Sequence, residues 1–129
     1  MSLERATDAE VAKRQAAAAS MASALTRAGF AVHVAEGVGT SIPGVEIVVD
    51  PFRADEGGGV YVGWHVGGEL VEDFSAPLLA QDWTHPALTL HGAIAEAMYD
   101  ALMRVLVASG FDVVPTDNDM SPLSIKLIV

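Results

Sequence analysis

Several short segments of this chain alternate apolar with polar or small side chains, and this period of two restricts its fold more than any other feature. Successive side chains of a strand point to opposite faces of a sheet, so the alternation predicts strands with one buried face. Glycine, proline and acidic residues separate the segments and are typical of turns. We expect strands at residues 30–35, 45–50, 60–66, 69–74, 111–114 and 123–129.

Two longer segments have helical character instead. In the first, Thr7 and Glu10 have the spacing of a capping box, in which the threonine hydroxyl accepts a hydrogen bond from the amide three residues later. An alanine-rich stretch follows and ends at Gly29, a residue suited to the left-handed conformation just past a helix. These signals predict a helix over residues 8–28.

A second helix is predicted over residues 91–109, and it ends at a glycine in the same way as the first. In both places the glycine is followed by a phenylalanine and then by a strand, at Gly29–Phe30 and at Gly110–Phe111. We interpret this likeness as one local solution used twice, and the alternative is an ancient duplication. The glycine ends the helix, and the aromatic side chain anchors the next strand in the core.

The order of elements predicts an α+β domain, a two-layer sandwich in which two main helices pack on one face of a mostly antiparallel sheet. The sheet should have five to six strands, in the order α-β-β-β-β-α-β-β. Gly67 and Gly68 have the form of a two-residue hairpin turn before the fourth strand. Residues 75–90 hold two prolines and a tryptophan, and their structure stays open. We expect a single domain over residues 1–129, with residues 1–6 as a disordered end.

Because side chains alternate along a strand, the position of each residue in a predicted strand assigns it to one of the two faces of the sheet. One face is almost wholly apolar and is expected to lie beneath the helices. The other mixes polar, aromatic and small side chains, and we expect it to be open because no helix is left to cover it. The core candidates include Val45, Ile47, Val62, Trp64 and Ile125. The candidate ligand-binding residues, all on the open face, are His33, Glu46, Asp50, Tyr61 and His65.

The net charge of −10 is unevenly distributed along the chain. The first 28 residues hold four basic and three acidic side chains, so the remainder holds three basic and 14 acidic ones. A body this acidic repels phosphate backbones, so we expect no nucleic-acid partner and favour a protein partner with a basic or apolar surface. No apolar run approaches the roughly 20 residues of a membrane span, and the first residues lack a hydrophobic signal region. We expect a soluble, cytoplasmic protein with no membrane partner.

Motifs for catalysis and for cofactor binding are missing from the sequence. The chain has no cysteine, which excludes thiolate chemistry and cysteine-based zinc sites. The spacing of Asp82, His85 and His91 matches no metal motif, and we interpret this segment as a helix entry with Thr84 or Thr89 as the cap. The glycine-rich segments are not followed by a helix and a lysine, so no phosphate loop is indicated. We therefore expect no metal and no cofactor.

The second predicted helix is apolar around most of its circumference, and such a helix is either central or covered by a partner. We expect a homodimer, unless residues 75–90 cover the helix within one chain. The favoured function is a small, acidic, non-enzymatic binding or adaptor protein that acts through protein–protein contacts. The alternative is a small-molecule-binding domain or enzyme that uses His33, Tyr61 and His65 on the open sheet face.

Overall fold

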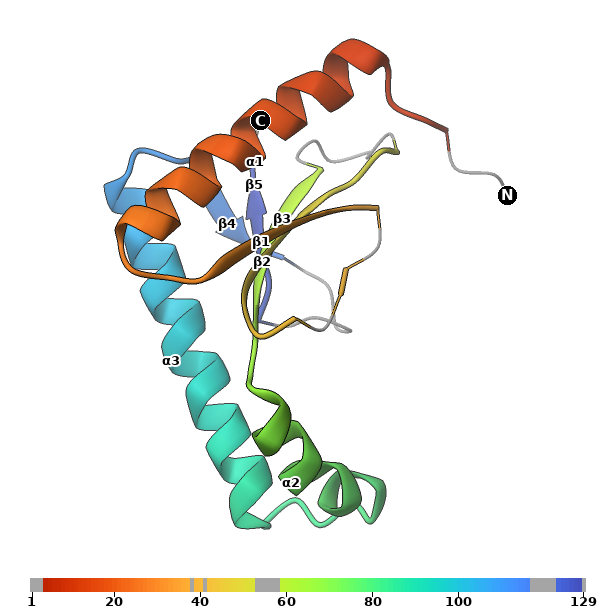
Figure 1. Cartoon of the computed structure of the whole chain (residues 1–129), viewed down its shortest axis with the longest axis vertical. Helices are drawn as coiled ribbons and strands as arrows, with labels where there is room; N and C mark the ends of the chain where they lie inside the picture. Colours follow the sequence, from red (N-terminus) through yellow and green to blue (C-terminus); the bar gives the residue numbers. More distant parts are fainter. Residues whose placement is uncertain (1–3, 38, 41, 53–58, 117–122, 129) are drawn as a thin grey trace.

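A computed structural model of the chain describes residues 4–37, 39–40, 42–52, 59–116 and 123–128. Within these ranges the chain forms three helices and a five-stranded, mixed but mostly antiparallel sheet, in the order α-β-β-β-α-α-β-β. Helices pack on the sheet, and the predicted α+β architecture is confirmed (Figure 1).

Along the chain the elements are α1 (Asp8–Arg27), β1 (Val32–Glu36), β2 (Gly44–Val49), β3 (Val60–His65), α2 (Gly68–Leu79), α3 (Pro86–Ala108), β4 (Val113–Pro115) and β5 (Ile125–Leu127). The strands lie side by side in the order β1-β2-β3-β5-β4. β1 and β2 are parallel, and every other neighbouring pair is antiparallel.

Both long helices end as the sequence predicts. The hydroxyl of Thr7 accepts a hydrogen bond from the N–H of Glu10 at 3.1 Å, which satisfies one free amide in the first turn of α1. Gly29 follows α1 with φ +104°, and Gly110 follows α3 with φ +92°. In each case the N–H after the glycine bonds back to the carbonyl five residues earlier, which is the Schellman arrangement of a helix end.

The core lies between α1, α3 and one face of the sheet. Val45 pairs with Trp64 and Ile47 pairs with Val62 across β2 and β3, so the residues predicted for this face do share it. Trp64 is half-buried there, and its ring meets that of Phe30 edge-on with 6.3 Å between centroids. The buried members of the core are Ala18, Met21, Leu25, Val45, Ile47, Val49, Val60, Val62, Leu102, Leu106, Val113, Ile125 and Leu127.

The start of the chain is attached to this body. Arg5 forms a single antiparallel bridge with Phe52, and the N–H of Ala6 donates to the carbonyl of Pro51 at 3.0 Å. Ala6 is buried. The disordered end predicted for residues 1–6 therefore does not extend to these positions, and residues 1–3 lie outside the described ranges.

The fourth predicted strand, at residues 69–74, is wrong because this segment lies in α2. Leu70 and Phe74 are one helical turn apart and both are half-buried, and α2 packs on α3. The ring of Phe74 lies edge-on to that of His91, with 4.6 Å between centroids. Gly67 is accordingly the extended N-cap of a helix and does not form a hairpin turn. An apolar pattern this short is compatible with a helix or with a strand, and in this chain packing against α3 favours the helix.

The second predicted helix begins earlier than expected, at Pro86. The N-cap is His85, whose Nδ1 accepts a hydrogen bond from the N–H of Ala87 at 3.1 Å. The prediction that Thr84 or Thr89 caps this helix is therefore wrong. Pro86 does occupy the first helical position, where its missing N–H has no intrahelical partner to lose.

The connection between β1 and β2 runs over the sheet face that carries no helix. A tight turn would make these neighbouring strands antiparallel, but they are parallel, so the connection carries the chain back along the strand. Thr40 in this connection contacts Glu46, whose side chain points away from the helices. At the end of the connection, Gly44 has φ +108°, and a Cβ there would lie 2.8 Å from the carbonyl oxygen of Ala31. Part of the face predicted to be open is thus covered.

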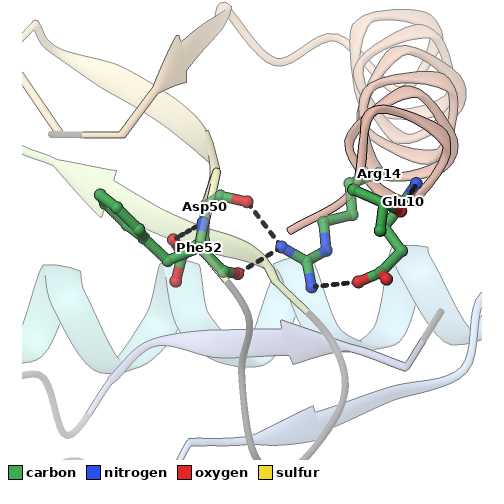
Figure 2. A network of polar contacts seen from close by, with 5 residues as sticks. Glu10, Arg14, Asp50 and Phe52 are labelled. Carbon is green, nitrogen blue, oxygen red and sulfur yellow. Dashed lines mark hydrogen bonds and ion pairs between the residues drawn. The ribbon is translucent and has the colours of Figure 1, made fainter. Parts of the chain in front are cut away.

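Arg14 joins α1 to the connection between β2 and β3. The residue is only 7% exposed, and its Nη1 donates to the carbonyl oxygens of Asp50 at 2.8 Å and Phe52 at 2.7 Å (Figure 2). Its Nη2 lies 4.0 Å from a carboxylate oxygen of Glu10. A Cβ at Gly59 would lie 2.4 Å from the Nε of Arg14, so the absence of a side chain there makes room for the guanidinium group.

Replacing Arg14 with methionine is expected to lower the free energy of unfolding by about 1–3 kcal/mol, because two partly buried carbonyls would lose their donor. Lys13→Met, at the neighbouring exposed position of α1, is the matched control and should change stability by less than about 0.5 kcal/mol. Urea unfolding followed by fluorescence of the half-buried Trp64 measures both variants. Equal, small losses in the two variants would contradict the role of Arg14.

Candidate functional site

Glu46, in the middle of β2, is a buried carboxylate on the sheet face that the helices leave free. Strand pairing places it between His33 of β1 and Gly63 of β3. The residue is only 5% exposed, although the sequence predicts an open position. Thr40, in the connection between β1 and β2, and the side chain of His65 contact its carboxylate and account for this burial.

Both carboxylate oxygens of Glu46 have defined partners. Oε2 accepts hydrogen bonds from the N–H of Thr40 at 2.7 Å and from its hydroxyl at 2.6 Å. Oε1 lies 3.1 Å from Nε2 of His65. A Cβ at Gly39 would lie 2.6 Å from Oε1, so a glycine there lets the connection approach the carboxylate. Sequence reasoning did not find Thr40, because the glycines before it also suit an ordinary turn.

These contacts hold Glu46 in its ionised form. Burial by itself would raise the pKa of this carboxyl. Three hydrogen bonds outweigh that effect, two from the hydroxyl and amide of Thr40 and one from His65, and the charge of His65 adds to them. Together they lower the pKa below its usual value of 4.5. An ionised carboxylate can only accept hydrogen bonds, so the His65 proton lies on Nε2. In the neutral ring, Nδ1 is then the nitrogen that can accept.

A histidine held by a carboxylate has a fixed tautomer and a fixed ring orientation, which acid–base catalysts exploit. The side chain of His65 is 36% exposed, so the ring is within reach of solvent. Gly63 adds no side chain to this face, and a Cβ there would meet no atom within 4 Å. The pair of Glu46 and His65 can therefore accept a hydrogen bond or a proton from a bound group.

The other three predicted ligand-binding residues take different positions. His33 lies across from Glu46 and is half-buried, and its Nε2 is buried without a hydrogen-bond partner in the part of the chain that the structure describes. Tyr61 lies on the same face, in the next row of paired residues. Asp50 follows β2, and its Oδ1 accepts from the N–H of Phe52 at 2.8 Å within its own turn (Figure 2). The structure thus brings Glu46 and His65 into contact and directs Asp50 elsewhere.

Within the described ranges, no group of three or more histidine, cysteine, aspartate or glutamate side chains is arranged to hold a metal ion. The two histidines that flank residues 86–90 have contacts within the fold. His85 caps α3, and His91 packs on Phe74. Their spacing is explained by the entry of α3 and by its packing on α2.

α2 and the first half of α3 form a helical hairpin that projects beyond the sheet (Figure 1). We refer to residues 68–101 as the hairpin. No residue from Gly67 to Ala101 is buried, although the segment is largely apolar. Its large exposed apolar side chains, between 39% and 87% exposed, are Val71, Leu78, Leu79, Trp83 and Leu90.

Residues 75–90 do not fully cover the apolar surface of α3 within one chain. Those that belong to α2 pack on α3 but stay partly exposed themselves, and Trp83 is 64% exposed. None of the helices, over the residues described, is long and apolar enough to cross a membrane. The apolar side chains of the hairpin are therefore left facing solvent in the single chain.

Charge on the hairpin is of one sign. Its sequence contains six carboxylates and neither lysine nor arginine. On α2, Glu69, Glu72 and Asp73 follow helical spacing along one side. Val71 and Leu78 lie seven residues apart, close to two full turns, and share another side of the same helix. The acidic side of α2 is therefore separate from the side of Val71 and Leu78, while Leu79, seven residues after Glu72, lies on the acidic side.

Comparisons with protein families, with curated proteins and with solved structures found no match for this chain. Two features of the molecule thus bear on its function. One is the pair of Glu46 and His65 on the helix-free face, and the other is the exposed apolar hairpin.

Replacing Glu46 with glutamine should destabilise the fold by about 1–3 kcal/mol at neutral pH, because charge-assisted hydrogen bonds to Thr40 and His65 would be lost. The lowered pKa means that the ionised carboxylate contributes stability above pH 4.5, and that this contribution disappears as the pH falls through the pKa of the folded state. The difference between the wild type and Glu46→Gln should therefore shrink below pH 4.5. Urea unfolding across this range measures it, with the exposed Glu72→Gln as control. A difference that is independent of pH would contradict an ionised Glu46.

Proposed function

We propose that this chain is a non-enzymatic protein-binding domain of the adaptor type, and that the hairpin is the surface that its partner covers. The observation that carries the proposal is the run from Gly67 to Ala101, which is largely apolar, mostly helical and without a single buried residue. Exposed apolar patches of this kind, next to polar surface, mark interaction sites in proteins.

The hairpin has little to stabilise it in isolation. Helices shorter than about 12–15 residues are marginal in water, and most helical stability in proteins comes from packing of an apolar face. α2 has 12 residues and includes Pro77, whose ring lacks the N–H that a helix interior uses. Within the described residues, α3 is the only element against which α2 packs extensively. A bound partner would supply the missing burial.

The exposed side chains are of the kind that stabilise protein interfaces. Full burial of a large aliphatic side chain is worth about 1.5–3 kcal/mol, and tryptophan is enriched among residues that dominate binding energy. Trp83 and Leu79 lie near the tip of the hairpin and are the most exposed of its apolar residues. The carboxylates on the other side of α2 favour a partner that contacts the apolar side and brings no further acidic groups toward them.

Hydrogen exchange on the full chain at low concentration should show protection factors at least about tenfold lower in the hairpin than in α1, because the hairpin opens without global unfolding. α1 in the same molecule is the control, since it packs on three strands. A covering partner should raise protection in residues 68–101. Equal protection of the hairpin and α1 in the dilute protein would contradict the proposal, because the hairpin would then need no partner.

A second candidate function is favoured by the pair of Glu46 and His65. A small-molecule-binding or acid–base site on the helix-free face would use His65 as the acceptor, with His33 and Tyr61 nearby in the same register. The space above Gly63 would take the bound group. This alternative concerns the opposite side of the sheet from the core, so that it can be tested separately from the hairpin.

Nuclear magnetic resonance of the histidine side chains distinguishes the alternative. If this face binds small molecules, a fragment library should shift the ring signals of His65 and His33 and leave those of His91 unchanged, since His91 packs on Phe74. Glu46→Gln should abolish the shifts because it releases the ring of His65. If no fragment in the library shifts the signals of His33 or His65, the alternative of a ligand-binding site on the helix-free face is wrong.

A further inference from the structure

We propose that the partner of the hairpin is a second copy of this chain, and that two hairpins pack together as a four-helix bundle. This inference rests on the proposed function, because it names the occupant of the same surface. The two-fold association of identical chains is the commonest form of oligomer, and two helical hairpins meeting face to face form a four-helix bundle.

The size of the hairpin suits such an interface. α2 is about 18 Å long, and the 16 residues of α3 from Pro86 to Ala101 span about 24 Å at 1.5 Å per residue. Two helices side by side, about 10 Å apart, have a projected face of roughly 500 Å², and side chains standing above it increase the accessible area. A standard stable interface buries about 800 Å² on each partner. The projected face is therefore about 60% of that area before the relief of the side chains is counted, which suits an interface at the small end of the range.

The distribution of charge permits the surface to meet a copy of itself. In a two-fold interface each patch packs on the same patch of the other subunit, so like charges in its centre would repel. The side of α2 that carries Val71 and Leu78 holds no charge, because Glu69, Glu72 and Asp73 lie on another side. Two apolar sides can therefore come together while the carboxylates remain in solvent.

α3 extends this uncharged surface. Leu90 and Ala97, seven residues apart, share one side of α3 and are exposed, as is Ala93, which lies toward the side that carries Glu96 and Asp100. The two alanines are short, so the backbone of a neighbouring helix can approach this part of α3 closely. Farther along, Asp100 pairs with Arg104 at 3.0 Å, which marks the solvated part of the helix. The hairpin thus offers a leucine beside small residues, as packing of a second hairpin requires.

A lipid surface is the less favoured occupant. Helices that lie on membranes usually carry lysine and arginine on their polar side, which anionic headgroups attract. The hairpin has six carboxylates and no basic residue, so its charge opposes such binding. A dimer through the helix-free face of the sheet is a further alternative, and Ile128, which is exposed at the end of β5, provides a probe for it.

Sedimentation equilibrium of the full chain over a range of concentrations tests the proposal. The wild type is expected to have twice the chain mass of 13.4 kDa. Leu78→Arg, on the uncharged side of α2, should raise the dissociation constant at least about 30-fold, the effect of losing an interface hot spot. Trp83→Arg, outside the helices, should do the same and guards against a variant of α2 that fails to fold. Ile128→Arg is the matched control and should remain dimeric.

Several outcomes would overturn the inference. A dimer that withstands both hairpin substitutions and dissociates in Ile128→Arg would place the interface on the sheet face. A monomeric wild type that binds vesicles of neutral phosphatidylcholine through the hairpin would replace the second copy with a lipid surface. If the chain is a monomer whose hairpin amides stay unprotected until a different protein is added, the inference of a second copy is wrong and the proposed function stands. A monomer with a fully protected hairpin would overturn the proposed function as well.

Discussion

Burial of one sheet face beneath α1 and the C-terminal half of α3 is the constraint on which the other features depend. Met21 and Leu25 from α1, and Leu102 and Leu106 from α3, close over the apolar residues of β2, β3 and β5. Close packing of these side chains permits only one strand register, because a slip of one residue would turn every buried side chain outward. That register also places the polar side chains of the same strands together on the opposite face.

The path of the chain explains why a carboxylate is buried on that opposite face. β1 and β2 are parallel neighbours, and the connection between them brings Thr40 to the side that no helix occupies. A buried carboxylate is costly unless hydrogen bonds replace its water. Thr40 and His65 provide those bonds for Glu46, so that the same contacts anchor the connection and orient the imidazole ring. A structural requirement and a candidate chemical site therefore coincide in one group of residues.

The two ends of α3 lie in different surroundings, and this difference carries the functional argument. Its C-terminal half contributes Leu102 and Leu106 to the core, while its N-terminal half lies in the hairpin beyond the sheet, where His91 packs on Phe74 of α2. The core gains its stability from long-range burial, but the hairpin contains no buried side chain in a single chain. A surface that is helical, apolar and incompletely covered depends on association for its stability, and the separate acidic side of α2 keeps charge away from that association.

Local features of the fold were predictable because they depend on neighbouring residues alone. The cap at Thr7, the helix ends at Gly29 and Gly110, and the phase that places Val45 and Ile47 in the core all follow from backbone geometry and side-chain periodicity. The sequence also placed His33, Glu46 and His65 on one face. Tertiary structure decided that residues 69–74 are helical, that β1 and β2 are parallel, and that Glu46 meets Thr40 and His65. These outcomes depend on which distant segments pack together and on the path between strands, and no local pattern encodes either.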